Sequence, residues 1–209
     1  MILRRVAQHV REQNWTAIGI DFLIVVVGVF VAIEVSEWKS DRATQARAEM
    51  FTSRLTDDLR REAWGYEYVV AYTREVLANA EVAVAGASGD ETISDEAFLV
   101  GAYRATQYRS YSRRQSTYEE LVSTGDIGLI TDDTLRAAAT LLNNSRVIDT
   151  ITEDGRTSEY RRVFRRRVPA DVQRVLLASC GDRYVEPLDF QGIVGSLDYA
   201  CDLDLAADR

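Results

Sequence analysis

The hydrophobic positions fall into two patterns along the chain. From Trp15 to Trp38 they form an almost unbroken run, WTAIGIDFLIVVVGVFVAIEVSEW, which has no polar side chain between Phe22 and Ile33. Widened to Ala17–Val35, the run is about 19 residues long and approaches the ~20 residues with which a helix crosses a ~30 Å hydrocarbon layer. Tryptophans are typical of membrane–water interfaces, so Trp15 and Trp38 are the expected anchors. The pattern predicts one transmembrane helix over residues 15–38, and it disfavours a buried core helix or a cleaved signal peptide.

Beyond this span, apolar residues recur every three or four positions, which is typical of amphipathic helices. The first series predicts that the helix continues as a stalk to about Val84, with Gly65 as its weakest point. Further helices are expected over 95–111, from about 117 to Gly125, from Asp132 or Asp133 to about 152, and over 170–179, with turns at 86–90 and 153–156. We therefore predict an all-α fold with four parts: an amphipathic tail (1–14), the transmembrane helix (15–38), an extramembrane helical bundle (39–181) and an acidic C-terminal tail (182–209).

One face of the predicted span combines small residues with an acid. Ala17, Asp21, Gly28 and Ala32 fall on one stripe of the helix. Small residues let a second helix approach closely in lipid, and an acid within a span is costly unless it faces protein or water. The stripe therefore predicts a helix-packing face, with Asp21 as a candidate proton relay. The alternative is that Asp21 lies close to the interface and reaches headgroup water.

The two cysteines, Cys180 and Cys201, bear on the compartment. An even pair in a domain without other cysteines fits one disulfide formed where conditions are oxidising. We therefore expect a bacterial inner-membrane protein with a cytoplasmic N-terminal tail on the lipid surface and a periplasmic domain. The alternative is a cytoplasmic domain with two unpaired thiols, because the positive charges on the two sides of the span are nearly balanced.

Charge and composition limit the chemistry. The net charge of −8 argues against nucleic acid as a partner, even though arginines and tyrosines alternate between Tyr103 and Tyr118. The only histidine is His9, which leaves the main domain without histidine-based metal sites or nucleophiles. We expect no cofactor and no enzymatic activity. A basic patch before Pro169 either forms a solvated helix face or binds anionic lipid, a cell-wall polymer or the acidic first helix; it comprises Arg161, Arg162, Arg165, Arg166 and Arg167.

Two motifs together resemble a known family. The span carries, in order, Asp21, Gly28, Ala32, Glu34 and Trp38, and residues 118–130 read YEELVSTGDIGLI. This combination resembles a bacterial family of small single-span membrane proteins of unknown function, which usually has Glu in place of Asp21 and Gln in place of Glu34. The resemblance implies the same architecture and no particular activity. The arrangement of tail, span and domain is also similar to that of proton-driven stator subunits, although their outer domains are not all-helical.

These observations lead to one functional expectation and two alternatives. We expect a non-enzymatic accessory subunit that docks through its transmembrane helix and its helical domain onto a larger membrane complex or onto copies of itself. The first alternative is a stator-like subunit that uses Asp21 to relay protons. The second is a periplasmic sensor module whose helical bundle binds a ligand.

Overall fold

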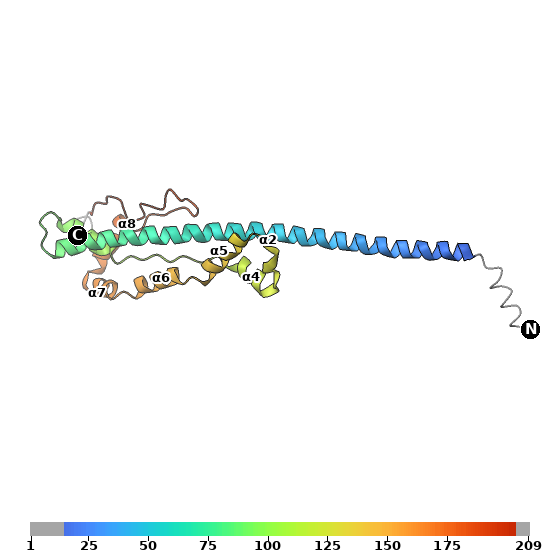
Figure 1. Cartoon of the computed structure of the whole chain (residues 1–209). Helices are drawn as coiled ribbons and strands as arrows, with labels where there is room; N and C mark the ends of the chain where they lie inside the picture. Colours follow the sequence, from blue (N-terminus) through green and yellow to red (C-terminus); the bar gives the residue numbers. More distant parts are fainter. Residues whose placement is uncertain (1–14, 204–209) are drawn as a thin grey trace, which may run out of the picture. The chain divides into compact units, whose positions relative to one another are not determined.

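The computed structural model describes residues 15–203, and side chains from residue 19 onward. The predicted tail over 1–14 lies outside the described residues. The chain divides into two compact units, Met1–Met50 and Phe51–Arg209. In the described residues every regular element is a helix, which confirms the all-α prediction (Figure 1). These elements are α2 (Trp15–Ala87), α3 (Asp95–Arg104), α4 (Ser116–Thr124), the 3₁₀ helix η1 (Asp126–Leu129), α5 (Asp133–Asn144), α6 (Val147–Thr157), α7 (Glu159–Arg167) and α8 (Ala170–Cys180).

The first unit consists of the N-terminal part of α2. This part contains a stretch that is long and apolar enough to cross a membrane, and none of that stretch is buried within the structure. Nearly all of its large apolar side chains are exposed, from Ile20 to Val35. At the C-terminal end of the span, Arg42 makes a cation–π contact with Trp38, with the guanidinium 3.9 Å from the centre of the ring.

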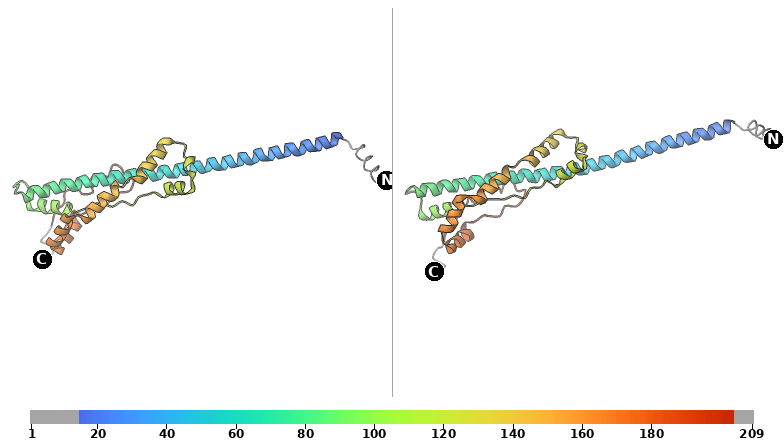
Figure 2. Two further views of the ribbon diagram at one scale, coloured as in Figure 1. Left: turned by 60° about the horizontal axis from the view of Figure 1, so that its bottom comes forward. Right: turned by 90° about the horizontal axis from the view of Figure 1, so that it is seen from below.

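The second unit is built on the C-terminal part of α2, from Phe51 to Ala87 (Figures 1 and 2). The shorter helices and two segments without regular structure pack on this part of α2. The crossing segment (residues 105–115) connects α3 to α4, and the C-terminal segment (residues 181–203) follows α8. Because no sheet is present among the described residues, α2 itself provides the surface on which the other elements pack.

Three hydrophobic clusters follow one another along this part of α2. The first joins α2 to α4, η1 and α5 and contains Phe51, Leu55, Leu121, Ile130 and Ala139. The second joins α2 to the C-terminal segment and contains Trp64, Tyr68, Val185 and Ile193. The third joins the end of α2 to α3, α7 and α8 and contains Ala83, Val100, Ala102, Tyr103, Phe164, Leu176 and Cys180. The core is therefore elongated along α2.

Local signals predicted several boundaries correctly. Helix α4 ends at Gly125, whose φ of 78° places it in the left-handed region that favours glycine. Helix α5 is capped by Asp132, whose carboxylate accepts the backbone N–H groups of Thr134 and Leu135. Ser94 caps α3 in the same manner.

Three other expectations differ from the structure. Helix α3 ends at Arg104 rather than near residue 111, because the residues that follow bond to other elements: the Arg109 carbonyl accepts from the Thr152 hydroxyl, and the Tyr111 hydroxyl donates to the Arg61 carbonyl. The helix expected up to about 152 breaks after Asn144. The turn expected over 153–156 is part of α6 instead. There, a Cβ on Gly155 would come within 2.5 Å of the Tyr108 Cβ, so this glycine permits close packing rather than a turn.

Candidate functional site

Two buried carboxylates of α2 hold the two irregular segments. Glu62 is only 2% exposed, and it accepts the backbone N–H of Arg114 and the Nε–H of Arg113, the latter over 3.4 Å. Arg113 also donates to the carbonyl oxygens of Leu142 and Ser145, at the break between α5 and α6. A buried charge is tolerated only when it is paired and hydrogen-bonded, and this cluster satisfies both conditions.

Glu75 plays the same role for the C-terminal segment. Its two carboxylate oxygens accept the backbone N–H groups of Gly195 and Leu197 over 2.6 and 2.7 Å. Glu62 and Glu75 are thirteen positions apart on α2, which separates their side chains by about 140° around a helix. The crossing segment and the C-terminal segment are therefore fastened to different sides of α2.

A third polar contact joins the two segments to each other. The Tyr72 hydroxyl donates to one oxygen of Asp182 over 2.7 Å, and Arg109 forms an ion pair with the other oxygen over 3.1 Å. Burial, followed by the negative charge of Asp182, raises the pKa of Tyr72 well above its usual range. Tyr72 therefore stays a neutral hydrogen-bond donor at physiological pH.

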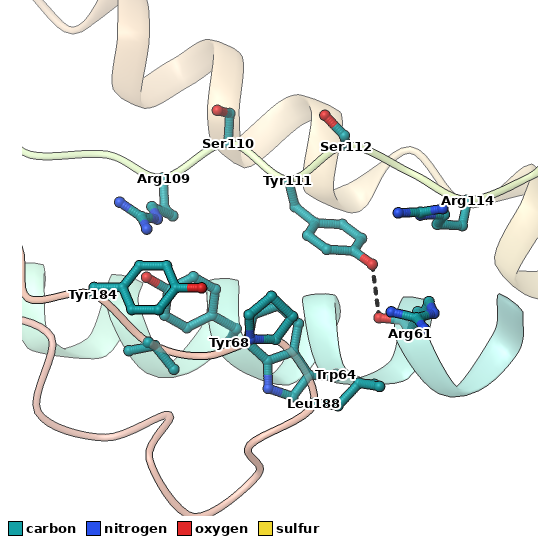
Figure 3. Close-up of a pocket in the computed structure, with 12 residues that line it drawn as sticks. Arg61, Trp64, Tyr68, Arg109, Ser110, Tyr111, Ser112, Arg114, Tyr184 and Leu188 are labelled. Carbon is teal, nitrogen blue, oxygen red and sulfur yellow. Dashed lines mark hydrogen bonds between the residues drawn. The ribbon is translucent and has the colours of Figure 1, made fainter. Parts of the chain in front are cut away.

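A cavity of about 320 Å³ opens between α2, the crossing segment and the C-terminal segment (Figure 3). Its volume is within the range of small-molecule sites, which starts at about 300 Å³. Residues of α2 form one wall and residues 109–114 form the other, while residues 184–188 close the side. The lining residues are Arg61, Trp64, Tyr68, Arg109, Ser110, Tyr111, Ser112, Arg114, Tyr184, Val185, Pro187 and Leu188.

All charged side chains that line this cavity are positive. Three of its lining residues are arginines, and none is an aspartate or glutamate, although the whole chain carries a net charge of −8. Arg109 is partly neutralised by Asp182 and lies over the Tyr68 ring. Within the described part of the chain, the guanidinium groups of Arg61 and Arg114 form no ion pair and no hydrogen bond. They are available to an anion.

Aromatic rings form the floor of the cavity. Trp64 and Tyr68 stack with their ring centres 5.1 Å apart, and the Tyr111 ring meets Trp64 edge-on at 6.1 Å. Two hydrogen bonds fix these rings, one from the Tyr111 hydroxyl to the Arg61 carbonyl and one from Trp64 Nε1 to the Asp189 carbonyl. Gly65 is needed here, because a Cβ at this position would collide with the Tyr111 ring. Tyr184 stands at the rim and is 81% exposed.

The predicted helix-packing face lies in the first unit. Asp21 and Ala32 are exposed, and a Cβ added to Gly28 would meet no atom within 4 Å. The described residues therefore leave this face open to another helix. Ala17 and Trp15 lie within α2, but their side chains are outside the described part of the structure.

The basic patch of α7 is not uniform. Arg161 is half-buried and donates to the Thr106 carbonyl over 2.6 Å, with its guanidinium over the Tyr108 ring. Burial is the main cause that lowers the pKa of Arg161. Arg162 forms an ion pair with Glu159 of the same helix. The remaining members of the patch, Arg165, Arg166 and Arg167, are exposed.

The predicted disulfide is present. Cys180, at the end of α8, is bonded to Cys201 near the end of the described chain. Two other contacts lie beside it, because Arg104 donates to the carbonyls of Cys180 and Tyr199. The bond ties the C-terminal segment to the third hydrophobic cluster, and the contacts of Gly195 and Leu197 with Glu75 hold the same segment against α2.

Sequence reasoning did not find the arginine cavity. The alternation of arginine and tyrosine before Tyr118 predicted either a solvated helix face or stacking of tyrosine and arginine on the acidic first helix; Arg109 does lie over the Tyr68 ring of α2, but the cavity itself was not predicted. The available signal was the period of two in Arg109, Tyr111 and Arg113, which fits an extended segment better than a helix. The described residues contain no group of three or more histidine, cysteine, aspartate or glutamate side chains placed to hold a metal.

No family model, curated protein or solved structure matches the chain. The similarity of the span and of residues 118–130 to a family of single-span membrane proteins therefore remains a prediction.

Proposed function

We propose that the chain is a non-enzymatic accessory subunit, anchored by one transmembrane helix, that docks onto a larger integral membrane complex. The observation that supports this role most directly is the fully exposed apolar stretch of α2. Exposed apolar surface on this scale is unstable in water and requires lipid or a partner. The second unit has its own core, so the two units divide the work between anchoring and interaction.

The open face of the span favours a helical partner over lipid alone. Lipid chains accommodate any apolar surface, whereas an acid such as Asp21 is best accommodated against protein or water. Gly28 and Ala32 supply a site of close approach on the same face. The partner is a helix of an integral membrane complex or a second copy of this chain, with membrane lipids covering the remaining faces.

The disulfide supports the compartment that we propose for the second unit. Disulfides persist in oxidising compartments and are rare in the cytoplasm. A bond between Cys180 and Cys201 thus favours a periplasmic second unit, a cytoplasmic N-terminus and a bacterial inner membrane.

A proton relay is the second candidate, and the position of Asp21 within the apolar stretch favours it. The two roles make opposite demands on Asp21. A relay needs an ionisable group, whereas a packing face needs only a polar group of similar shape. The change Asp21→Asn separates them, because it would abolish proton transport while leaving an accessory subunit assembled and active.

The deciding experiment is purification from native membranes in mild detergent, with mass measurement of the intact particle and identification of its components. A stable particle that contains other integral membrane proteins is the expected result. A particle that contains only copies of this chain would replace the accessory role with self-assembly. Recovery of the chain as a monomer under conditions that preserve other membrane complexes would contradict both.

A further inference from the structure

We propose that the arginine cavity of the second unit binds a small ring compound that carries a carboxylate. The site combines the guanidinium groups of Arg61 and Arg114, which have no partner among residues 15–203, with a floor of aromatic rings. This inference does not depend on the membrane role proposed above, because every lining residue belongs to the second unit.

The N–H donors of the two arginines are the reason to expect a carboxylate on the ligand. A guanidinium group offers a planar fork of N–H donors that matches the two oxygens of a carboxylate. Arg61 comes from α2 and Arg114 from the crossing segment, and Figure 3 shows both side chains at the same end of the cavity. None of the described residues that line the cavity is acidic. The hydroxyls of Ser110 and Ser112 extend the set of donors along the same wall.

The position of Arg114 is fixed by the fold. Its backbone N–H is held by the buried Glu62 carboxylate, while its side chain remains exposed. The neighbouring Arg113 points instead to Glu62 and to the carbonyls at the break between α5 and α6. Of two adjacent arginines, one is therefore used by the fold and the other is left to the cavity.

The aromatic residues of the cavity and its volume are the reasons to expect a ring in the ligand. Ring compounds pack favourably against aromatic side chains. Trp64 and Tyr68 are buried at the base of the cavity and fixed by stacking and by the Trp64–Asp189 hydrogen bond, so the half-buried Tyr111 and the exposed Tyr184 offer the free aromatic surface. A volume of about 320 Å³ accommodates a single-ring compound with some water. The exposed Tyr184 ring lies at the other end of the cavity, beside Tyr68 and Arg109, where it offers a further aromatic surface to the ring of a ligand (Figure 3). Aromatic acids and sugar acids share this chemistry.

The test is calorimetric titration of the full chain in lipid nanodiscs with four probes. Benzoate is compared with neutral benzamide, and glucuronate is compared with neutral glucose. We expect one of the two acids to bind and its neutral counterpart to bind at least about tenfold more weakly, because a hydrogen-bonded charge pair contributes more than a neutral contact. Which acid binds distinguishes an aromatic ligand from a sugar. Equal binding of acid and neutral probe, or no binding of either acid, would overturn the proposal.

Variants locate the binding. Arg61→Gln and Arg114→Gln should each weaken the acid about tenfold without lowering the melting temperature, since neither guanidinium bonds to any other residue that the structure describes. Arg60→Gln is the matched control, because it removes the same charge from the adjacent exposed position outside the cavity. If Arg60→Gln weakens binding of the acid equally, general surface charge explains the binding and the proposed site is wrong. Tyr184→Ala should weaken the ring acids but not acetate; an equal effect on acetate would overturn the role of the ring.

Failure of this test is distinguishable from failure of the accessory role. The calorimetric result concerns the isolated chain, whereas the accessory role is decided by the composition of the particle purified from membranes. A chain that binds neither acid can still be an accessory subunit.

Discussion

The hydroxyl of Tyr72 donates a hydrogen bond of 2.7 Å to Asp182, across 110 positions of sequence. Tyr72 lies on α2 and is almost completely buried, while Asp182 is the second residue of the C-terminal segment. Asp182 also pairs with Arg109 of the crossing segment. One carboxylate thus joins the three parts that surround the arginine cavity.

This relationship predicts a loss of stability at alkaline pH. A tyrosine in the unfolded chain releases its proton near pH 10, but burial and the charge of Asp182 raise the pKa of Tyr72 in the folded protein. The unfolded state therefore binds fewer protons above about pH 10, and the free energy of unfolding falls as pH rises past that point. Burial also raises the pKa of Tyr103, Tyr111 and Tyr160, which adds to the effect. Below pH 10 the contribution is fully present.

The change Tyr72→Phe should show how much Tyr72 contributes to the loss of stability at alkaline pH. We expect the variant to lose about 1–2 kcal/mol at pH 7, because one hydrogen bond to a charged group is removed. We also expect a shallower decline in stability above pH 10 than in the wild type. Denaturant unfolding at a series of pH values measures both. An unchanged alkaline slope would show that Tyr72 does not keep its proton in the folded state.

The contact between Glu75 and the C-terminal segment gives a second prediction. Its two oxygens each accept one backbone N–H, from Gly195 and from Leu197. In Glu75→Gln, one oxygen becomes an amide nitrogen that cannot accept, so one buried N–H loses its partner at a cost of about 1–3 kcal/mol. Faster amide hydrogen exchange at these two residues, together with lower stability in denaturant, is the expected result.

Glu67→Gln is the control for this change. Glu67 lies on the same helix and is exposed, and its replacement by glutamine changes the net charge by the same amount. It should leave both the stability and the exchange rates nearly unchanged. If the two variants behave alike, the effect comes from net charge and the Glu75 contact is unimportant.

The parts of the fold that the sequence predicted are those that depend on local chemistry. Gly125 ends α4 because only a residue that tolerates positive φ fits there, and Asp132 starts α5 through its own side chain. The span depends only on a continuous apolar run. In each case the signal and its structural consequence lie within a few residues of one another.

The parts that were not predicted depend on distant contacts. The residues after α3 are not helical because they bond to distant elements, as the Arg109 carbonyl does with the Thr152 hydroxyl of α6, 43 positions away. The arginine cavity exists because buried Glu62 holds the backbone of Arg114, 52 positions away. An acid in an amphipathic helix gives no local sign that it will be buried against another segment. Local patterns could therefore not have placed Arg61 and Arg114 together.

The disulfide provides a third prediction. Replacing Cys180 and Cys201 together by serine should lower the free energy of unfolding by about 3 kcal/mol, because the bond restricts a loop of about 20 residues in the unfolded chain. The variant should still fold, since the Glu75 contacts continue to hold the C-terminal segment. Thermal or denaturant unfolding measures the difference. Reductant should destabilise the wild type but not the serine variant, and an equal response of both would mean that another effect of the reductant is being observed.

The span gives the fourth prediction, which concerns assembly. Gly28→Leu should disrupt association with the partner helix, because the added side chain occupies the open space beside the backbone. Val26→Leu is the matched control, since it enlarges a side chain about 160° away around the same helix. Asp21→Asn should leave assembly intact. Particle mass after mild-detergent purification distinguishes these variants, and the relevant comparison is between Gly28→Leu and Val26→Leu. Equal loss from both would indicate a general effect on insertion, whereas no loss from either would remove Gly28 from the interface.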